Sequence, residues 1–209
     1  MARQTIINTI RHAQTSYNFE KRYAGSIDIS LSEKGVLESQ KAAIYLSGMR
    51  FDVVIASTLK RTIETAKILV SDHTPIVQSI LCVERNYGVF EGHTLQEAQD
   101  FQPPVLWIEV GNDTHSVNPQ GSEPFEQVWE RARKFRNWLF REYAGCNILV
   151  VSHGTFLQMF HGLLRGLNCI ESLAFYPSNL ELATFCFKGK RLVDEKYSAP
   201  LFLQLQKTF

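Results

Sequence analysis

Three short apolar runs constrain the fold of this chain more than any other feature of the sequence. Residues 4–10, 52–56 and 147–152 are rich in β-branched and aliphatic side chains, which favours buried strands. Each is followed, directly or after a loop, by a segment with the apolar spacing of a helix, at about 32–47, 59–70 and 155–164. Alternation of strands and helices predicts an α/β protein, a three-layer α/β/α sandwich with a mostly parallel sheet.

The rest of the chain predicts a single domain over residues 1–209. Residues 122–143 form a long apolar-striped helix, and strands near 180–187 and 191–197 flank a Lys-Gly-Lys turn typical of a hairpin. Segment 83–121 is irregular, with two adjacent prolines and a Gly-Asn-Asp run. We expect it to be an insertion or lid over one end of the sheet. Its apolar side chains suggest a partly hydrophobic lid; they include Phe90, Phe101, Trp107 and Ile108.

Composition excludes several classes of function. Among 209 residues, 22 Lys and Arg oppose 21 Asp and Glu, a net charge of +1. This balance lacks the basic excess of a nucleic-acid binder and gives no attraction to anionic membranes. No run approaches the roughly 20 apolar residues of a membrane span, and the first ten residues do not resemble a secretion signal. We therefore expect a cytoplasmic monomer or homodimer whose partner is a small molecule.

The cysteines and histidines predict no metal site. Four cysteines, at positions 82, 146, 169 and 186, lie too far apart for a zinc knuckle or a redox pair. The histidines at 73, 93, 115 and 161 show no metal-ligand spacing. No glycine-rich phosphate loop is present either. We therefore expect free thiols, no cofactor and no metal.

Polar clusters follow each of the three strands. They are Arg11-His12, Ser57 to Arg61, and Ser152-His153-Gly154. Ligands of an open α/β sheet bind at the carboxyl ends of the strands, so these clusters are expected to meet at one edge of the sheet. Two imidazoles among arginines suit phosphoryl transfer, because one imidazole attacks phosphorus while the cations stabilise the phosphoryl oxygens.

These clusters and three further motifs, in this order along the chain, resemble the histidine phosphatase superfamily, the phosphoglycerate-mutase-like proteins. The resemblance extends from Arg11 to about Asn179. It implies the phosphoglycerate-mutase-like fold and metal-independent phosphatase chemistry. The six motifs are Arg11 to Thr15, Arg22 to Gly35, Ser57 to Ala66, Glu84 to Gly92, Gly121 to Glu123, and Val150 to Gly154.

The resemblance implies a role for each matching residue. His12 corresponds to the nucleophile that becomes a phosphohistidine, while Arg11, Arg61 and His153 would surround the phosphoryl group. Glu84 corresponds to the general acid that protonates the leaving alcohol and later activates water. Substrate-binding positions are implied at Thr15, Asn18, Arg22, Gly25, Ser57, Arg85 and Gly154.

Physical chemistry agrees with these roles. Nearby arginines lower the pKa of a histidine, and only neutral imidazole is a nucleophile. A general acid must hold a proton near neutral pH, which requires burial or a second carboxylate such as Glu91. One branch of the family uses an aspartate directly after the second histidine as its acid. Gly154 occupies that position here, so Glu84 is the matching candidate.

Three functions fit the motifs: a phosphatase, a cofactor-dependent phosphoglycerate mutase and a non-catalytic phosphate-binding module. Segment 22–35 resembles the mutases, but the stretch between Gly92 and Gly121 lacks any Lys or Arg for a second phosphate, and Ala24 replaces a hydroxyl residue. Both departures favour a phosphatase. Ala13 replaces the glycine usual after the histidine, yet the retained catalytic set argues against a non-catalytic module.

Overall fold

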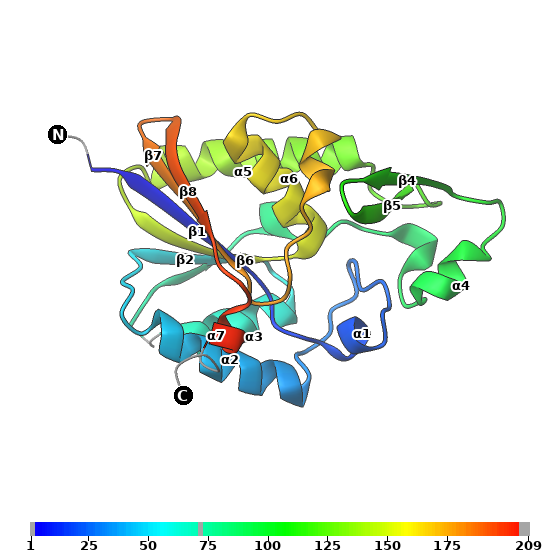
Figure 1. Cartoon of the computed structure of the whole chain (residues 1–209), viewed down its shortest axis with the longest axis horizontal. Helices are drawn as coiled ribbons and strands as arrows, with labels where there is room; N and C mark the ends of the chain where they lie inside the picture. Colours follow the sequence, from blue (N-terminus) through cyan, green and yellow to red (C-terminus); the bar gives the residue numbers. More distant parts are fainter. Residues whose placement is uncertain (1–2, 71–72, 205–209) are drawn as a thin grey trace.

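A six-stranded sheet forms the centre of the computed structural model, which describes residues 3–70 and 73–204 (Figure 1). The strand order is β3-β2-β6-β1-β7-β8. The pairs from β3 to β1 are parallel, whereas β1–β7 and β7–β8 are antiparallel. The strands are β1 (Thr5–Arg11), β2 (Val53–Ala56), β3 (Ile76–Gln78), β6 (Asn147–Ser152), β7 (Leu182–Lys188) and β8 (Arg191–Tyr197).

Helices cover both faces of this sheet (Figure 1). One layer contains α2 (Glu33–Leu46), α3 (Lys60–Leu69) and α7 (Leu201–Gln204), and the other contains α5 (Phe125–Glu142) and α6 (Gly154–Arg165). Successive strand side chains point to opposite layers: in β2, Ile55 joins the core under α5 and α6, while Val54 joins the core under α2 and α3. The predicted α/β sandwich with its mostly parallel sheet is confirmed.

Local chemistry sets the ends of the helices. The side chain of Ser32 accepts a hydrogen bond from the Gly35 amide and begins α2, as the sequence predicts. The long helix α5 begins at Phe125 rather than at 122, because a residue before proline disfavours helical geometry and Pro124 occupies the N-cap. No helix in the described ranges has both the length and the apolar character needed to cross a membrane.

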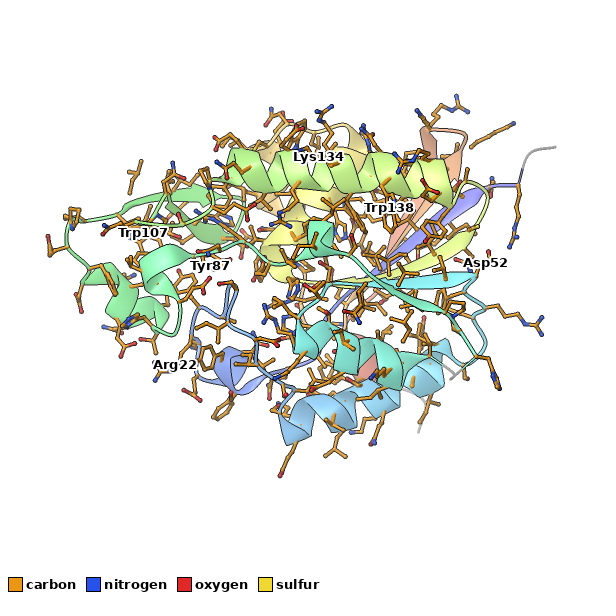
Figure 2. The ribbon with its side chains drawn as sticks, turned by 180° about the vertical axis from the view of Figure 1, so that it is seen from behind. Arg22, Asp52, Tyr87, Trp107, Lys134 and Trp138 are labelled. Carbon is orange, nitrogen blue, oxygen red and sulfur yellow. The ribbon has the colours of Figure 1, made fainter. Side chains whose placement is uncertain are left out.

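Segment 83–121 is more ordered than its irregular sequence predicts. It contains a short helix, α4 (Leu95–Gln99), and an antiparallel hairpin of β4 (Leu106–Val110) and β5 (Asp113–Val117). Phe90 is fully buried and packs on Phe101 and Trp107, with ring centroids 5.3 and 5.8 Å away. Three of the side chains expected in a hydrophobic lid therefore pack against one another. Trp107 and Tyr87 lie at the same end of the molecule as Arg22 (Figure 2).

Candidate active site

The three strand-end clusters meet beside a cavity of about 350 Å³. His12 and Arg11 reach it from the end of β1, and Arg61 reaches it from the first turn of α3. Glu84 lines the same cavity from the loop that follows a 3-10 turn at Ile80–Cys82. The other lining residues are Tyr17, Asn18, Lys21, Arg22, Tyr23, Ala24, Gly25, Tyr87, Leu95 and Tyr176.

His12 is held as a neutral imidazole with one free ring nitrogen. Its Nδ1 lies 2.8 Å from the carbonyl oxygen of Ala13, which can only accept, so Nδ1 carries the proton. No described group hydrogen-bonds Nε2, which leaves its lone pair available. Burial lowers the pKa of His12 well below its usual value, and the charges of Arg61 and Arg11 lower it further. The neutral form is the one that a nucleophilic imidazole requires.

His153 lies beside His12 with both ring nitrogens occupied. The ring centroids are 5.2 Å apart. Nδ1 of His153 accepts from Arg61 Nε (3.1 Å), so the neutral ring carries its proton on Nε2 and donates to the Ser57 hydroxyl (2.7 Å). Burial and the charge of Arg61 hold the pKa of His153 well below its usual value. Ser57 therefore supports His153, which is fully buried, and neither residue is among those that line the cavity.

The two arginines beside His12 are fixed by backbone carbonyls. Arg61 is fully buried and donates from Nη1 to Ile27 O and from Nη2 to Gly25 O, each at 2.8 Å. Arg11 donates from Nη1 to Pro177 O (2.9 Å). Its buried Nε has no partner among the described residues. A buried N–H without a partner is costly, so Arg11 is ready to donate to a bound oxyanion.

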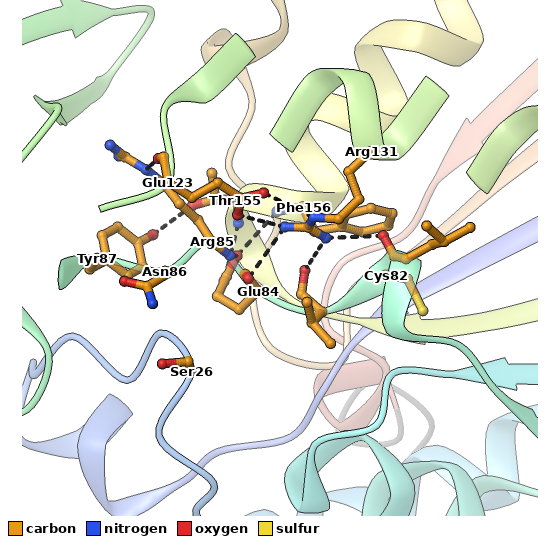
Figure 3. A network of polar contacts seen from close by, with 12 residues as sticks. Ser26, Cys82, Glu84, Arg85, Asn86, Tyr87, Glu123, Arg131, Thr155 and Phe156 are labelled. Atoms are coloured by element: carbon orange, nitrogen blue, oxygen red, sulfur yellow. Dashed lines mark hydrogen bonds and ion pairs between the residues drawn. The ribbon is translucent and has the colours of Figure 1, made fainter. Parts of the chain in front are cut away.

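Glu84 sits at the N-terminus of α6, where backbone amides surround its carboxylate (Figure 3). Oε1 accepts from the amides of Arg85 (2.8 Å) and Phe156 (3.2 Å), and Oε2 accepts from the amide of Thr155 (3.3 Å). The side chain is almost completely buried. The expected neighbouring carboxylate, Glu91, instead accepts from the amides of Ser26 and Tyr87. Burial and helix amides, rather than a second acid, define the surroundings of Glu84.

The remaining predicted binding positions fall into two groups. Asn18, Arg22 and Gly25 line the cavity. Thr15 is fully buried, and its hydroxyl caps the short helix α1 (Ser16–Phe19) by accepting from the Asn18 amide. Gly154 is buried at the start of α6 and is not among the residues that line the cavity.

Arg85 lies outside the cavity of His12. It lines an adjoining cavity of about 190 Å³ that shares the side chains of Tyr23, Tyr87 and Tyr176. Its guanidinium donates to the carbonyls of Glu123 (2.8 Å) and Ser116 (3.0 Å), and its buried Nη2 has no partner among the described residues.

Comparison with known proteins identifies the family. Residues 7–198 match the family model of the histidine phosphatase superfamily (branch 1). The chain belongs to this superfamily. Phosphoserine phosphatase 1 of Hydrogenobacter thermophilus is 27% identical over 187 residues, covering 88% of this chain and 87% of that protein. A bifunctional protein of Mycobacterium tuberculosis is 34% identical over 182 residues, covering 84% of this chain and 47% of its own length.

A solved structure of the same fold is the phosphoserine phosphatase of Entamoeba histolytica in complex with 3-phosphoglyceric acid. It has a TM-score of 0.76 and 21% identity, covering 95% of this chain and 99% of the other. These comparisons confirm the predicted enzyme class, a phosphatase of the histidine phosphatase superfamily.

Motif reasoning missed one residue that positions Glu84 in this histidine phosphatase. Arg131 of α5 donates from Nη1 to the carbonyls of Leu81 (3.0 Å) and Val83 (2.7 Å), and forms a two-pronged ion pair with Glu123 (Nε 3.0 Å, Nη2 2.8 Å; Figure 3). It therefore fixes the backbone directly before Glu84. The amphipathic pattern of α5 gave no signal for this role, because the carbonyl partners of Arg131, at Leu81 and Val83, lie 50 and 48 residues away in sequence.

Arg131→Met should destabilise the enzyme by about 3 kcal/mol, because it leaves a mostly buried carboxylate without its partner. We also expect kcat to fall by roughly tenfold or more as Glu84 loses its fixed position. Urea unfolding and steady-state kinetics measure the two effects. The matched control is Arg133→Met on the same helix, whose pair with Glu130 is exposed; it should change stability by less than about 1 kcal/mol. Equal effects from both variants would contradict the role of Arg131.

Acidification should destabilise this fold through its buried histidines. His12 and His153 have pKa values well below the usual value, burial lowers that of His161 to about 3, and burial lowers the pKa of His115 as well, which adds an effect of the same sign. Below the unfolded pKa of about 6.5, the unfolded chain binds protons that the folded chain excludes. The stabilisation is therefore complete above that pKa and is lost as the pH falls toward the folded values.

Between about pH 7.5 and 5.5 we expect the free energy of unfolding to fall by roughly 4 kcal/mol, about 1.4 for each of the three histidines. Urea unfolding at the two pH values measures this change. His161→Gln removes one titrating group outside the active-site cavity and should reduce the change by about a third. A free energy of unfolding that is independent of pH in this window would contradict the prediction.

Proposed function

We propose that this chain is a metal-independent phosphomonoester hydrolase that acts on a small phosphorylated metabolite through a phosphohistidine intermediate. The observation that supports this most is the imidazole of His12. It is buried and neutral, its Nδ1 proton is fixed by a carbonyl, its Nε2 is free, and it lies between two guanidinium groups. A nucleophile activated in this way suits attack on a phosphoryl group.

In the proposed first step, Nε2 of His12 attacks phosphorus and the bond from phosphorus to the leaving oxygen breaks. Arg11 and Arg61 stabilise the phosphoryl oxygens, and Glu84 gives its proton to the departing alkoxide. In the second step, Glu84 takes a proton from water as the water oxygen attacks the phosphohistidine. The bond between nitrogen and phosphorus then breaks, which releases phosphate and restores neutral His12.

Glu84 must be protonated for the first step. Three backbone amides donate to the two carboxylate oxygens of Glu84 and fix its orientation at the wall of the cavity.

The distribution of cations favours a phosphatase over a mutase. A mutase must hold a second phosphate while its bisphosphate intermediate turns over. The cationic side chains that line the cavity are Arg11, Lys21, Arg22 and Arg61, and none comes from the stretch between Gly92 and Gly121. We propose that segment 83–121 acts instead as a lid, since Glu84, Tyr87 and Leu95 line the cavity from it.

Trapping the intermediate tests the proposal. The protein is mixed with a ³²P-labelled aryl phosphate in excess chelator and quenched in alkali, in which phosphohistidine survives. We expect label on the peptide that contains His12, and release of phosphate without added metal. Label on another residue, or activity that requires a metal, would contradict the mechanism. Isomerisation of 3-phosphoglycerate in the presence of catalytic 2,3-bisphosphoglycerate, without phosphate release, would instead establish a mutase.

A further inference from the structure

The active-site cavity has two chemically different ends. The phosphoryl end contains His12, Arg11, Arg61 and Glu84, and the rest of the lining is rich in aromatic rings. Four tyrosines line it, together with Leu95: Tyr17 and Tyr23 from one segment, and Tyr87 and Tyr176 from two others. A leaving group attached to phosphorus at His12 would extend along these rings.

Tyr23, Tyr87 and Tyr176 stay uncharged at neutral pH. Burial raises the pKa of Tyr23 to about 12, and it also raises the pKa of Tyr87 and of Tyr176. The rings of Tyr23 and Tyr87 are packed with their centroids 4.8 Å apart. The Tyr87 hydroxyl lies 2.6 Å from the hydroxyl of Thr155 (Figure 3). The leaving-group end therefore offers aromatic surface rather than charge.

The cationic side chains near the leaving-group end of the cavity are already paired, exposed to solvent, or part of the adjoining cavity. Arg22 donates to the carboxylate of Glu20 (2.6 Å) and to the carbonyl of Gly92 (2.9 Å). Lys21 is exposed. Arg85, whose buried Nη2 has no partner among the described residues, lines the adjoining cavity and not the cavity of His12. In the cavity of His12, apart from the arginines of the phosphoryl end, the cations among the described residues are therefore Arg22, which is already paired, and Lys21, which is exposed.

Although it is 37% exposed, Tyr176 is packed on two sides. Its hydroxyl end lies against Gly154, where an added Cβ would be 2.1 Å from Tyr176 Oη. The guanidinium of Arg11 stacks on its ring, 4.7 Å from the centroid. Because Gly154 has no side chain, the ring of Tyr176 can reach the cavity beside Glu84. An aspartate, which one branch of the family has at this position, would collide with that ring.

We propose that this site selects phosphate monoesters whose leaving alcohol carries a flat, uncharged ring, and that Tyr176 is a specificity-determining residue. The inference rests on the proposed function and specifies its substrate class. Contacts between aromatic rings stabilise a complex by more than the buried area alone predicts. For an aromatic over a saturated ring of similar size, this corresponds to a preference of about three- to tenfold.

Two esters that differ only in flatness test this preference. Benzyl phosphate and cyclohexylmethyl phosphate are both esters of primary alcohols of similar size, so general acid catalysis acts on them alike. We expect kcat/KM for benzyl phosphate to be about three- to tenfold higher, with phosphoserine and 3-phosphoglycerate slower than both. Faster hydrolysis of either acidic ester, or a benzyl to cyclohexylmethyl ratio of one or less, would overturn the proposal.

Three variants test the role of Tyr176. Tyr176→Leu should bring the ratio close to one, while Tyr176→Phe should keep it. If Tyr176→Leu also disturbs Arg11, which stacks on the Tyr176 ring, the hydrolysis of both esters slows equally and the ratio of their kcat/KM values does not change. The control is Phe175→Leu, an exposed neighbour that packs near Arg165 and should keep the ratio of the unaltered enzyme. A ratio that persists in Tyr176→Leu would overturn the assignment of Tyr176.

Binding of phosphonates separates this proposal from the hydrolytic function. Benzylphosphonate and cyclohexylmethylphosphonate cannot be hydrolysed, and calorimetry should show the same three- to tenfold preference for the flat ring. Equal Kd values would overturn the proposed ring selectivity even in an active enzyme. Preferential binding without hydrolysis of any ester would retain the ring selectivity and refute the hydrolase.

Discussion

His12→Ala should lower phosphate release from an aryl phosphate by about 10⁴- to 10⁶-fold, as expected for the loss of a covalent nucleophile. The neighbouring imidazole does not replace it. Nδ1 of His153 is occupied by Arg61, and Nε2 carries the proton donated to Ser57. The variant keeps both arginines, so substrate should still bind. Steady-state hydrolysis of p-nitrophenyl phosphate in excess chelator measures the loss, and calorimetry with a phosphonate measures binding.

The control for this prediction is a second buried histidine. His161 lies outside the active-site cavity, and its Nε2 is 2.7 Å from the Thr9 hydroxyl. His161→Gln should retain kcat within a few-fold even though it lowers stability. If folded His12→Ala retained more than about a hundredth of the activity, His12 would not be the nucleophile.

Glu84→Gln should produce a loss that depends on the leaving group. An alkyl phosphate needs a proton on its departing oxygen, so we expect kcat to fall by about 10²- to 10⁴-fold. p-Nitrophenolate leaves without a proton, so its ester should lose less than about tenfold in the same step. Glutamine has the shape of glutamate but presents only one acceptor oxygen to the three amides around it.

A series of esters with increasingly basic leaving groups measures this effect. In the variant, log kcat should fall more steeply with the basicity of the alcohol than in the unaltered enzyme. Glu97→Gln is the control, since this carboxylate is half exposed and lies outside the cavity. An equal loss for alkyl and aryl esters would show that Glu84 has a structural role rather than that of a proton donor.

The sequence predicts the fold because its signals are local. The β-branched runs and apolar helix stripes lie within windows of 5 to 22 residues, and packing them into layers leaves few alternatives. The hairpin of β4 and β5 was missed because the segment Asp113–Val117 has almost no apolar side chains. Its ordering comes from pairing with β4 rather than from its own composition.

For the candidate site too, the residues that local signals place were predicted, and those placed by long-range side-chain contacts were not. His12, Arg61 and His153 follow strands, so topology alone brings them together. The contacts of Arg131 and Tyr176 depend on the directions of side chains that are far apart in the sequence. Hydrophobic periodicity does not predict such directions. The placement of Arg85 has the same origin: its motif places it beside Glu84, whereas its guanidinium points toward the carbonyls of Ser116 and Glu123.

The position of β1 within the sheet has a consequence for local stability. This strand is paired on both sides, with β6 and with β7, so its amides should be among the slowest to exchange with solvent. The loop that carries Glu84 has no such ladder and depends on the side chain of Arg131. Subglobal opening of that loop would therefore remove Glu84, the proposed proton donor, while His12, the proposed nucleophile, remains in place. An enzyme opened in this way would still accept a phosphoryl group from an activated ester but would no longer cleave an alkyl one.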